Sequence, residues 1–399
     1  MNRSAAARPD TIRAHNLAML LQEVHRAGEC TRSDLTRRLS LSRSTIGALV
    51  ADLCELRLVE ERVPTGGSRA GRPSHVVAPR PDGPYAVAVD VDVTRVCTAA
   101  VGLGGQVLAR HDVPTRPAPP DPQTVVQIVV EAAQRLERLV PPDAWPIGIG
   151  VSVPGTVGRH DALIEFAPNL AWRHEPFGAL LSARTPELPV AVGNDADVAV
   201  LAEHLRGAAR GTDDVVYLMA RVGVGAGVIV NGSPLRGRDG HAGEVGHNVM
   251  DSSGPRCHCG KRGCVETYIG DKALLKLAGR RRPPTLEAVA AVLADARAGD
   301  PCAIEAVRTV ARGLGATIGA LVNVLNPELV VLGGSLTGVL ELAGDEVDKA
   351  MDGYAMTTAR QPVRLAAPGL GTDSSLLGAA ELAFAQLLAD PTRREARRR

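Results

Sequence analysis

The stretch GHAGEVGHNVMDSSGPRCHCGKRGCVE, residues 240–266, is the most distinctive part of this 399-residue sequence, because it places three of the chain's seven cysteines within eight residues. A Cys-x-Cys pair, a turn that contains glycine and a third Cys can bring three thiolates together, and a neutral imidazole would complete a closed Cys₃His tetrahedron for zinc. Closed sites of this kind are structural, so we expect one structural zinc ion per chain. A reduced cluster without metal is the alternative. The candidate ligands are Cys257, Cys259, Cys264 and one of His241, His247 and His258.

The remaining cysteines and the lack of long apolar runs indicate the compartment. An odd set of seven cysteines, three of them clustered, argues against a disulfide framework and for a reducing environment. No stretch reaches the roughly 18 uncharged apolar residues of a membrane helix, and the N-terminus carries no apolar signal sequence. We therefore expect a soluble, cytoplasmic protein with no membrane partner. The cysteines expected to be small core residues are Cys30, Cys54, Cys97 and Cys302.

The formal net charge of +1 conceals an uneven distribution. Residues 1–80 hold 13 Arg, no Lys and 8 Asp or Glu, for a charge of +5, whereas the other 319 residues carry 32 basic and 36 acidic residues, for −4. A small basic head on a larger acidic body suggests that one end of the chain meets a polyanion. A merely solvated surface is the alternative that charge alone leaves open.

Three helices are predicted in the basic head. Apolar residues recur at helical spacing from Thr11 to Ala27. Thr31 can cap a short second helix, with Asp34 three residues further on, and Ser42 can cap a third helix whose polar face opens with Arg43. Two short helices joined by a tight turn, the second presenting polar residues at its N-terminal end, are typical of a helix-turn-helix that enters a DNA major groove.

A wing is predicted directly after these helices. Two alternating strands, LVEERV (58–63) and HVVAPR (75–80), flank the Gly-rich loop PTGGSRAGRPS (64–74). The pattern predicts a winged helix-turn-helix domain over residues 1–82 whose partner is a double-stranded DNA operator, and an interaction module that binds no DNA is the alternative. Since only 2% of the chain is aromatic, we do not expect recognition of single strands by base stacking. The expected DNA contacts are Thr31, Arg32, Arg43, Ser44, Thr45, Arg69 and Arg72.

Strand and helix signals alternate beyond the Pro-rich segment APRPDGP (78–84). The predicted strands are AVAVDV, IGIGVSV, VAVGND, VVYLMARVGVGAGVIV and LVVLGGS, and the predicted helices are QTVVQIVVEAAQRLERL, ADVAVLAEHL, AIEAVRTVARGLGATIGALVNVL and SLLGAAELAFAQLL. This alternation predicts an α/β body over residues 83–390, with helices covering mixed sheets. Residues 391–399, which include RREARRR, are predicted to form a basic disordered tail.

Landmarks of the body occur in an order that is similar to a known family. They are Asp90 near a strand end, the pair Asn194-Asp195, the Gly-rich VGVGAG, the cysteine block, and NPELVVLGG near the end. With these features the chain resembles the ROK family (repressor, open reading frame, kinase) over about residues 11–388. The resemblance implies a two-lobed actin-like (ribonuclease H-like) body of the ATPase superfamily, and the winged-helix head resembles that of the family's transcriptional repressors.

The resemblance also implies a sugar site. It assigns the fourth zinc ligand to the His of Glu-x-Gly-His, which is His247. In related kinases the sugar is held by the Glu and His of that motif, by the Glu after the last Cys, by a loop similar to PNLAW, and by an Asn-Asp pair whose Asp is the catalytic base. Zinc would then support the pocket from behind. Turn-forming roles for the asparagines and a helix-terminus role for Glu266 remain alternatives. The residues carried over are Asn169, Asn194, Asp195, Glu244, His247 and Glu266.

The nucleotide site departs from the family pattern. Related kinases hold phosphate with Asp-x-Gly-Gly-Thr, but the matching stretch here is DVDVTR, in which Asp92 and Val93 replace both glycines. A carboxylate facing a triphosphate would repel it by ~4 kcal/mol for a like-charge pair about 4 Å apart. A second loop that reads Gly-Thr-Gly in the kinases is Arg-Val-Gly here, so Val222 removes a hydroxyl donor. We therefore expect ATP not to bind, no enzymatic activity, and Asp195 as a vestigial base.

The interpretation that follows is a DNA-binding transcriptional regulator, a repressor rather than an activator, whose kinase-like body senses a small sugar. A homodimer or a dimer of dimers is expected, because helix-turn-helix proteins commonly read paired half-sites. We expect the helices that begin near Ile12 and Ala303 to carry the movement from sugar to DNA. The alternatives are an active sugar kinase with an added DNA-binding head, and a scaffold that binds a partner protein.

Overall fold

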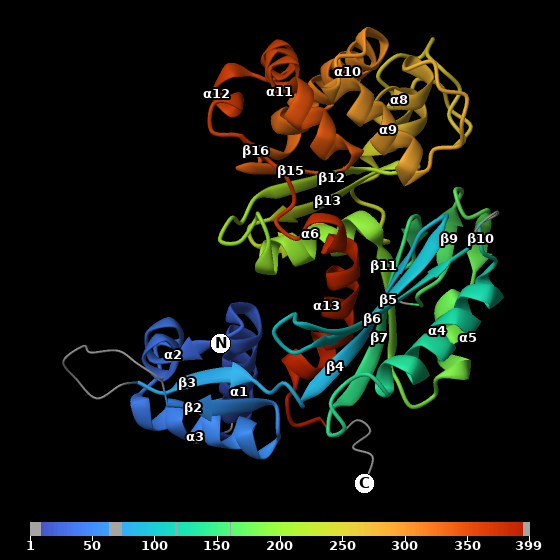
Figure 1. The fold of residues 1–399 in the computed structure, drawn as a ribbon. Coiled ribbons are helices and arrows are strands. Elements are labelled where there is room, and N and C mark those ends of the chain that lie inside the picture. The colour runs from blue at the N-terminus through green and yellow to red at the C-terminus, as the bar shows by residue number, and fades with distance from the viewer. Residues whose placement is uncertain (1–8, 64–73, 116–118, 160, 394–399) are drawn as a thin grey trace, which may run out of the picture.

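The computed structural model describes residues 9–63, 74–115, 119–159 and 161–393, which form a small head and two α/β lobes (Figure 1). In the head, three helices pack beside a three-stranded sheet of order β1-β3-β2. The prediction of a helical head with two wing strands is confirmed, and the short strand β1 is an addition that the sequence did not suggest. The head consists of α1 (Pro9–Ala27), β1 (Cys30–Thr31), α2 (Arg32–Leu39), α3 (Arg43–Glu55), β2 (Val59–Arg62) and β3 (Val76–Pro79).

Local chemistry explains where the head's helices begin. Thr31 and Asp34 form a reciprocal capping box at the start of α2, and the Ser42 hydroxyl accepts from the backbone N–H of Thr45 at the start of α3. Ser40, in the left-handed region at φ 54°, ends α2 and makes the tight turn between the two helices. The loop between β2 and β3, including Arg69 and Arg72, lies outside the described residues, as do residues 394–399 of the tail.

Lobe 1 is built on a five-stranded sheet of order β11-β7-β4-β5-β6. Strands β4, β5 and β6 form an antiparallel meander, and β7 and β11 extend it in parallel from the β4 side. Helices α4 and α5 cover one face, and a separate sheet of order β10-β9-β8 lies beside it (Figure 1). The lobe consists of β4 (Pro84–Val91), β5 (Arg95–Gly102), β6 (Val107–Pro114), α4 (Pro122–Glu137), β7 (Trp145–Val153), β8 (Thr156–Val157), β9 (Ile164–Ala167), β10 (Trp172–Glu175), α5 (Phe177–Arg184), β11 (Val190–Asn194) and α6 (Asp195–Arg206).

Lobe 2 repeats the same sheet plan in the order β14-β13-β12-β15-β16, with an antiparallel meander extended by two parallel strands. This repetition confirms the predicted two-lobed actin-like architecture. One prediction was wrong in detail: VVYLMARVGVGAGVIV is two antiparallel strands, because the chain reverses at residues 221–223. The lobe consists of β12 (Val215–Ala220), β13 (Val224–Val230), β14 (Ser233–Pro234), the 3₁₀ turn η1 (Val245–His247), α7 (Glu266–Ile269), α8 (Asp271–Leu277), α9 (Leu286–Arg297), α10 (Pro301–Leu325), β15 (Leu329–Gly334), α11 (Ser335–Tyr354), α12 (Thr357–Arg360) and β16 (Arg364–Ala366).

The C-terminal helix α13 (Ser374–Ala389), which follows the 3₁₀ turn η2 (Gly371–Asp373), returns to lobe 1 and packs on β4, β7 and α6. One continuous apolar cluster joins α1 and α3 of the head to β4, β5 and α13, so the head shares its core with lobe 1. Cys30 and Cys97 belong to this core as expected, whereas Cys302 is exposed, which corrects the prediction for that residue. In the described part of the chain, no helix combines the length and the apolar character that a membrane crossing requires.

Candidate functional site

A cavity of about 430 Å³ lies between the two lobes, and all six residues that the sequence predicted for the sugar site line it. Lobe 1 contributes the strand and loop ends around residues 92, 155, 165 and 169, and the start of α6. Lobe 2 contributes the turn at residues 221–223 and the loop before and after η1. The lining also includes two carboxylates that sequence reasoning missed, Glu165 and Asp197. Asp197 could have been identified from the sequence, because it lies two residues after Asp195 in the first turn of the same helix.

The N-terminus of α6 faces the cavity. Asn194 caps this helix: its Oδ1 accepts from the backbone N–H groups of Ala196 at 2.9 Å and Asp197 at 3.2 Å, while its Nδ2 donates to the carbonyl of Gly155 at 3.0 Å. The capping role that the sequence left open for Asn194 is therefore present, and the side chain lines the cavity as well. Asp195 follows it and is buried, at 6% exposure.

The surroundings of this helix end raise the pKa values of its two carboxyl groups, Asp195 and Asp197. Burial raises the pKa of Asp195 to about 7; the neighbouring Arg221 opposes the rise, and Asp90 adds to it. Burial likewise raises the pKa of Asp197 to about 7, against the influence of Arg236. Carboxyl groups poised near neutrality are typical of functional sites, and they can both donate and accept hydrogen bonds.

Glu266 connects the cavity to the cysteine loop. Its Oε2 accepts from the backbone N–H of Val224 at 3.2 Å, and its Oε1 lies 2.9 Å from Nδ1 of His258. A Cβ at Gly223 would come within 2.8 Å of Glu266 and 3.2 Å of the Asn169 amide, so glycine permits the turn to approach both side chains closely. Glu266 is the first residue of the short helix α7, but its carboxylate bonds Val224 and His258 of lobe 2 beside the cavity.

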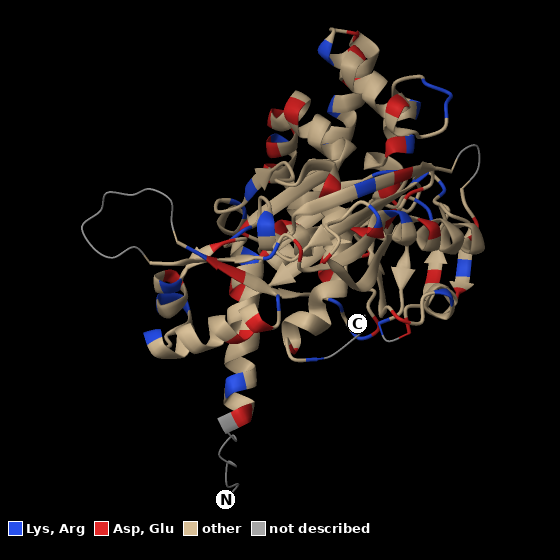
Figure 2. Ribbon diagram, turned by 60° about the horizontal axis from the view of Figure 1, so that its bottom comes forward, with Lys and Arg blue, Asp and Glu red and all other residues tan. Residues whose placement is uncertain are grey.

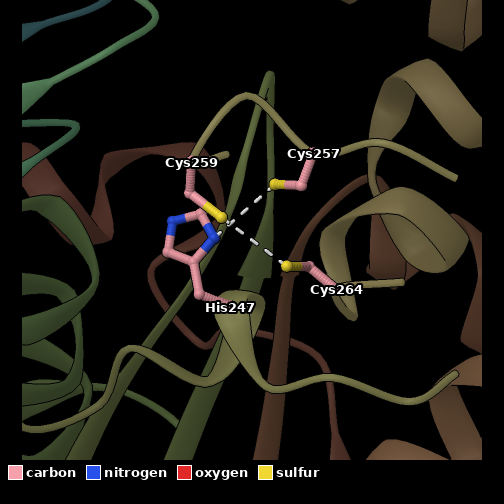
Figure 3. A group of neighbouring side chains, drawn as sticks. All are labelled: His247, Cys257, Cys259 and Cys264. Atoms are coloured by element: carbon pink, nitrogen blue, oxygen red, sulfur yellow. Dashed lines mark hydrogen bonds between the residues drawn. The ribbon is translucent and has the colours of Figure 1, made fainter. Parts of the chain in front are cut away.

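The cysteine loop brings four side chains together from a 3₁₀ turn and the loop that follows it. Figure 3 shows His247, Cys257, Cys259 and Cys264 pointing toward one another. Cys257 and Cys264 are buried, and the ligand atoms of all four residues lie within 4.8 Å of one another. The structure therefore supports His247 as the fourth member. His241 lies elsewhere, beside Glu165 at 3.3 Å, and His258 is edge-on to His247 while bonding Glu266.

The spacing of these atoms fits zinc. A tetrahedral ion with bonds of ~2.3 Å to sulfur holds its ligand sulfurs roughly 3.8 Å apart. Cys259 Sγ and Cys264 Sγ are 3.7 Å apart, and Cys257 Sγ lies 3.8 Å from His247 Nδ1. The Cys₃His donor set leaves no open position, so the cluster can hold a structural zinc ion rather than a catalytic one.

The predicted phosphate end of the cavity holds an arginine among acids. Arg221 Nη1 lies 3.2 Å from Asp90 Oδ2 and 3.8 Å from Asp92 Oδ2, and Ser152 donates to the other oxygen of Asp90 at 2.8 Å. Burial opposes the charge on Arg221, but Asp90 and Asp92 outweigh it and raise its pKa. From the sequence we expected Asp92 to repel phosphate as an unpaired negative charge. In the structure Asp92 is paired with Arg221 across the two lobes, so the arginine also occupies this end of the cavity.

The predicted DNA contacts lie at the outer end of the head. Arg43 and Ser44 are exposed at the start of α3, and Thr45 is half-buried there. Thr31 uses its side chain in the capping box, and Arg32 donates to Glu61 Oε2 at 2.6 Å, so these two residues already have partners within the head. Figure 2 shows basic segments on the outermost head helices, on the side away from the lobes. Arg69 and Arg72 lie outside the described residues and stay predictions.

Comparison with protein families supports both halves of the architecture. Residues 86–386 match the ROK family, and residues 18–70 match the MarR family. The first match covers the two lobes, and the second covers the three helices of the head and its first wing strand. The chain thus combines a ROK body with a MarR-like winged helix-turn-helix head.

The individual proteins that are similar to this chain include both a glucokinase and transcriptional repressors. The chain is 32% identical over 316 residues to a glucokinase of Streptomyces coelicolor, covering 74% of this chain and 96% of the glucokinase. It is 29% identical over 326 residues to the xylose repressor of Bacillus subtilis, covering 80% and 82% of the two chains. A crystal structure of a ROK family transcriptional regulator, a homolog of the E. coli MLC protein, matches with a TM-score of 0.77 and 25% identity over 95% of this chain and 97% of that one. The chain therefore belongs to the ROK family.

Proposed function

We propose that this protein is a DNA-binding transcriptional regulator, a repressor, whose kinase-like body senses a sugar without phosphorylating it. The observation that carries this proposal is the MarR-like winged helix-turn-helix head, fused to the lobes through a shared hydrophobic core. The match to an MLC-homolog regulator spans the head as well as the lobes, whereas the glucokinase match spans 74% of this chain. Similarity to the xylose repressor supports a sugar as the effector.

The six cavity residues are proposed to hold the sugar. Carboxylates and amides suit a sugar because each can form paired hydrogen bonds with neighbouring hydroxyls. Lobe 1 contributes Asn169 and the helix end at Asn194 and Asp195 to the lining, and lobe 2 contributes Glu244, His247 and Glu266. Zinc bound by His247 and the three cysteines would fix the loop that carries Glu266, one ion per chain, with no role in chemistry.

Loss of kinase activity is proposed from the phosphate end. Asp92, Val93 and Val222 stand where related kinases have two glycines and a hydroxyl, and Arg221 fills the space between the acids. A nucleotide would have to displace that pairing. The proposed role of Asp195 is therefore to accept or donate a hydrogen bond to the sugar.

Helix α6 is proposed to carry the sugar signal to the head. It begins at the cavity and ends at Arg206, about 18 Å away for twelve residues of helix. A Cβ at Gly227 of β13 would meet the Ala196 carbonyl at 2.3 Å, and one at Gly378 of α13 would meet the Val198 carbonyl at 1.9 Å. Because α6 touches both backbones this closely, movement of one lobe against the other must shift it.

The far end of α6 reaches the head through a buried polar cluster. Arg206 Nη1 donates to the carbonyl of His25 in α1 at 2.6 Å, and Arg206 Nη2 bonds Glu381 of α13 at 2.5 Å. His25 Nε2 lies 2.8 Å from Glu381 and 2.5 Å from Arg206 Nη2, and its Nδ1 accepts from the Gly104 N–H at 3.0 Å. The helix beginning near Ile12 thus keeps its proposed role, whereas α10, which contains Ala303, lies in lobe 2, away from the head (Figure 1).

The test measures sugar binding and DNA binding in the same protein. Calorimetry against a sugar panel identifies the effector, and affinity for an operator fragment, selected from random DNA, is then measured with and without that sugar. A sugar that loosens DNA must itself bind more weakly to the DNA-bound protein, with a coupling of about 1 to 3 kcal/mol. An identical operator affinity at saturating sugar would refute the sensor. A homodimer is expected, and ultracentrifugation decides it.

An active sugar kinase is the second candidate, because the buried Asp195, whose pKa is about 7, suits a general base and because glucokinases match the lobes. Incubation of the protein with ATP and each sugar that binds distinguishes the two. Robust phosphorylation by the unmodified protein would place the kinase first. Absence of turnover, together with improved nucleotide binding by the double variant Asp92→Gly, Val93→Gly, would support the sensor.

A further inference from the structure

We infer that the cavity accepts only sugars that carry no anionic group, and that the pairing of Arg221 with Asp90 and Asp92 excludes sugar phosphates and nucleotides. This inference rests on the proposed sugar-sensing function and names the chemical class of its effector. The effector would be an uncharged sugar or an amino sugar, bound by the cavity before any phosphorylation.

The charge of the lining is the first observation. Among the residues that the structure describes, six acidic side chains line the cavity against one Arg and one Lys, and the lining stays acidic although burial raises the pKa of Asp195 and Asp197 to about 7. Like charges that converge on a cleft between two lobes reinforce one another, so an incoming phosphate meets a repulsive field. Sugar hydroxyl groups are attracted instead, because each carboxylate oxygen can accept a hydrogen bond from them. The acidic lining residues are Asp92, Glu165, Asp195, Asp197, Glu244 and Glu266.

Arg221, the one arginine of the described residues that lines the cavity, is already paired with acids. The Arg221 side chain is only 16% exposed, and its Nη1 atom contacts Asp90 at 3.2 Å and Asp92 at 3.8 Å. Asp90 accepts from the Ser152 hydroxyl at 2.8 Å and Asp92 from the Val93 N–H at 2.5 Å, so both acids are held beside the guanidinium. A phosphate that approaches Arg221 would therefore meet two carboxylates that offset the charge of the arginine. Arg221 therefore contributes no net attraction for an anion.

The other cationic groups offer no replacement. Lys261 lies in the cysteine loop, where zinc with three thiolates and one imidazole would carry a net charge of −1. His258 is bonded to Glu266 at 2.9 Å and His241 to Glu165 at 3.3 Å. Each imidazole in the lining thus already faces a carboxylate or the metal cluster.

Two variants that each remove one negative charge provide the test. Asp92→Asn keeps an oxygen to accept the 2.5 Å bond from the Val93 N–H but releases Arg221 from one carboxylate. Glu131→Gln removes an equal charge from an exposed position of α4 that does not line the cavity, and is the matched control. Should the first variant not fold, Asp92→Ala replaces it. Calorimetry measures the full-length proteins against pyrophosphate, against glucose, mannose, galactose and xylose, and against the phosphate ester of the tightest sugar.

Wild-type protein is expected to bind the free sugar at least about 100-fold more tightly than its phosphate ester. Asp92→Asn should narrow the ratio of the two affinities at least about tenfold and bind pyrophosphate at least about tenfold better than wild type, whereas Glu131→Gln should change both quantities by less than threefold. Wild-type affinity for the ester equal to that for the sugar would overturn the inference, as would equal pyrophosphate binding by all three proteins. If no sugar bound at all, the sensor proposal would fail, while the pyrophosphate measurement would still decide the exclusion of anions.

Discussion

Replacing Arg206 should disconnect the sugar from the DNA without abolishing the binding of either. Arg206 makes three buried hydrogen bonds at the end of α6, to the His25 carbonyl at 2.6 Å, to His25 Nε2 at 2.5 Å and to Glu381 at 2.5 Å, with its own side chain 10% exposed. Each hydrogen bond to a charged group contributes about 1.5 to 3 kcal/mol. Arg206→Lys keeps a cation beside Glu381 but replaces the planar guanidinium with a single nitrogen, so at least one of these bonds should be lost and the contact between α6 and the head should weaken by about 1.5 to 3 kcal/mol. That loss is as large as a typical allosteric coupling energy, which is about 1 to 3 kcal/mol.

The assay is a thermodynamic cycle on full-length protein. Operator affinity is measured with and without saturating sugar, and sugar affinity with and without operator. The sugar cavity and the N-terminal end of α3 both lie away from Arg206, so each separate affinity should stay within about threefold of wild type. The ratio between the two operator affinities should fall to less than about twofold. Arg210→Lys, at an exposed position four residues further on, is the matched control and should keep the wild-type ratio.

Two results would contradict this reasoning. Unchanged coupling in Arg206→Lys would mean that the signal passes through another contact between lobes and head. Loss of DNA affinity with and without sugar alike would mean that Arg206 only holds the head in place. Arg206→Gln separates these cases further, because it leaves Glu381 without its cation and should destabilise the protein by about 3 to 5 kcal/mol, which a melting curve detects.

Three further measurements address the cavity and the metal. Metal analysis of purified protein should give one zinc per chain, and Cys257→Ser should lower both zinc content and sugar affinity, because the metal supports the loop that ends at Glu266; full sugar affinity in zinc-free protein would contradict this. Glu244→Ala, Asp195→Ala and Glu266→Ala should each weaken sugar binding by about 1 to 3 kcal/mol, since each leaves a sugar hydroxyl without its partner, and normal affinity in all three would place the sugar elsewhere. Because the pKa of Asp195 is raised to about 7, the folded state keeps a proton that the unfolded state releases above roughly pH 4, so this group lowers stability as pH rises to 7. The unfolding free energy of Asp195→Asn should therefore rise relative to that of the wild type between pH 5 and 7.5, by about 2.5 kcal/mol; a difference independent of pH would show that the carboxyl titrates normally.

The sequence correctly predicted those structural elements that are determined by residues close together in the chain. The capping box of Thr31 and Asp34 and the cap at Ser42 are set by residues three positions apart, and these helices begin where expected. The cysteine ligands lie within eight residues, so loop geometry alone brings them together. The sugar residues are spread over almost 100 positions, and it was the family resemblance that collected them.

What the sequence could not predict depends on contacts between distant segments. Nothing local to α1 indicates that it shares a core with α13, more than 350 residues away, because an apolar helix face fits many partners. The turn at residues 221–223 lies inside a run that is apolar except for Arg221, so the hydrophobic pattern alone did not divide the run into two strands. Glu165 enters the cavity through the small sheet of β8, β9 and β10, which carried no recognisable motif.

At the phosphate end of the cavity, the substitutions in the two loops compensate each other's charge. Asp92 alone would place another carboxylate next to Asp90 and Asp195, and Arg221 alone would face one acid fewer; together their charges offset each other across the lobes. The two substitutions thus act as a pair, and a double-mutant cycle should detect it. Asp92→Asn and Arg221→Gln should each destabilise the protein, and the double variant should be more stable than the sum of the single losses predicts, by about 0.5 to 3 kcal/mol. Additivity within about 0.5 kcal/mol, measured by denaturant unfolding, would show that Asp92 and Arg221 are independent substitutions rather than one device.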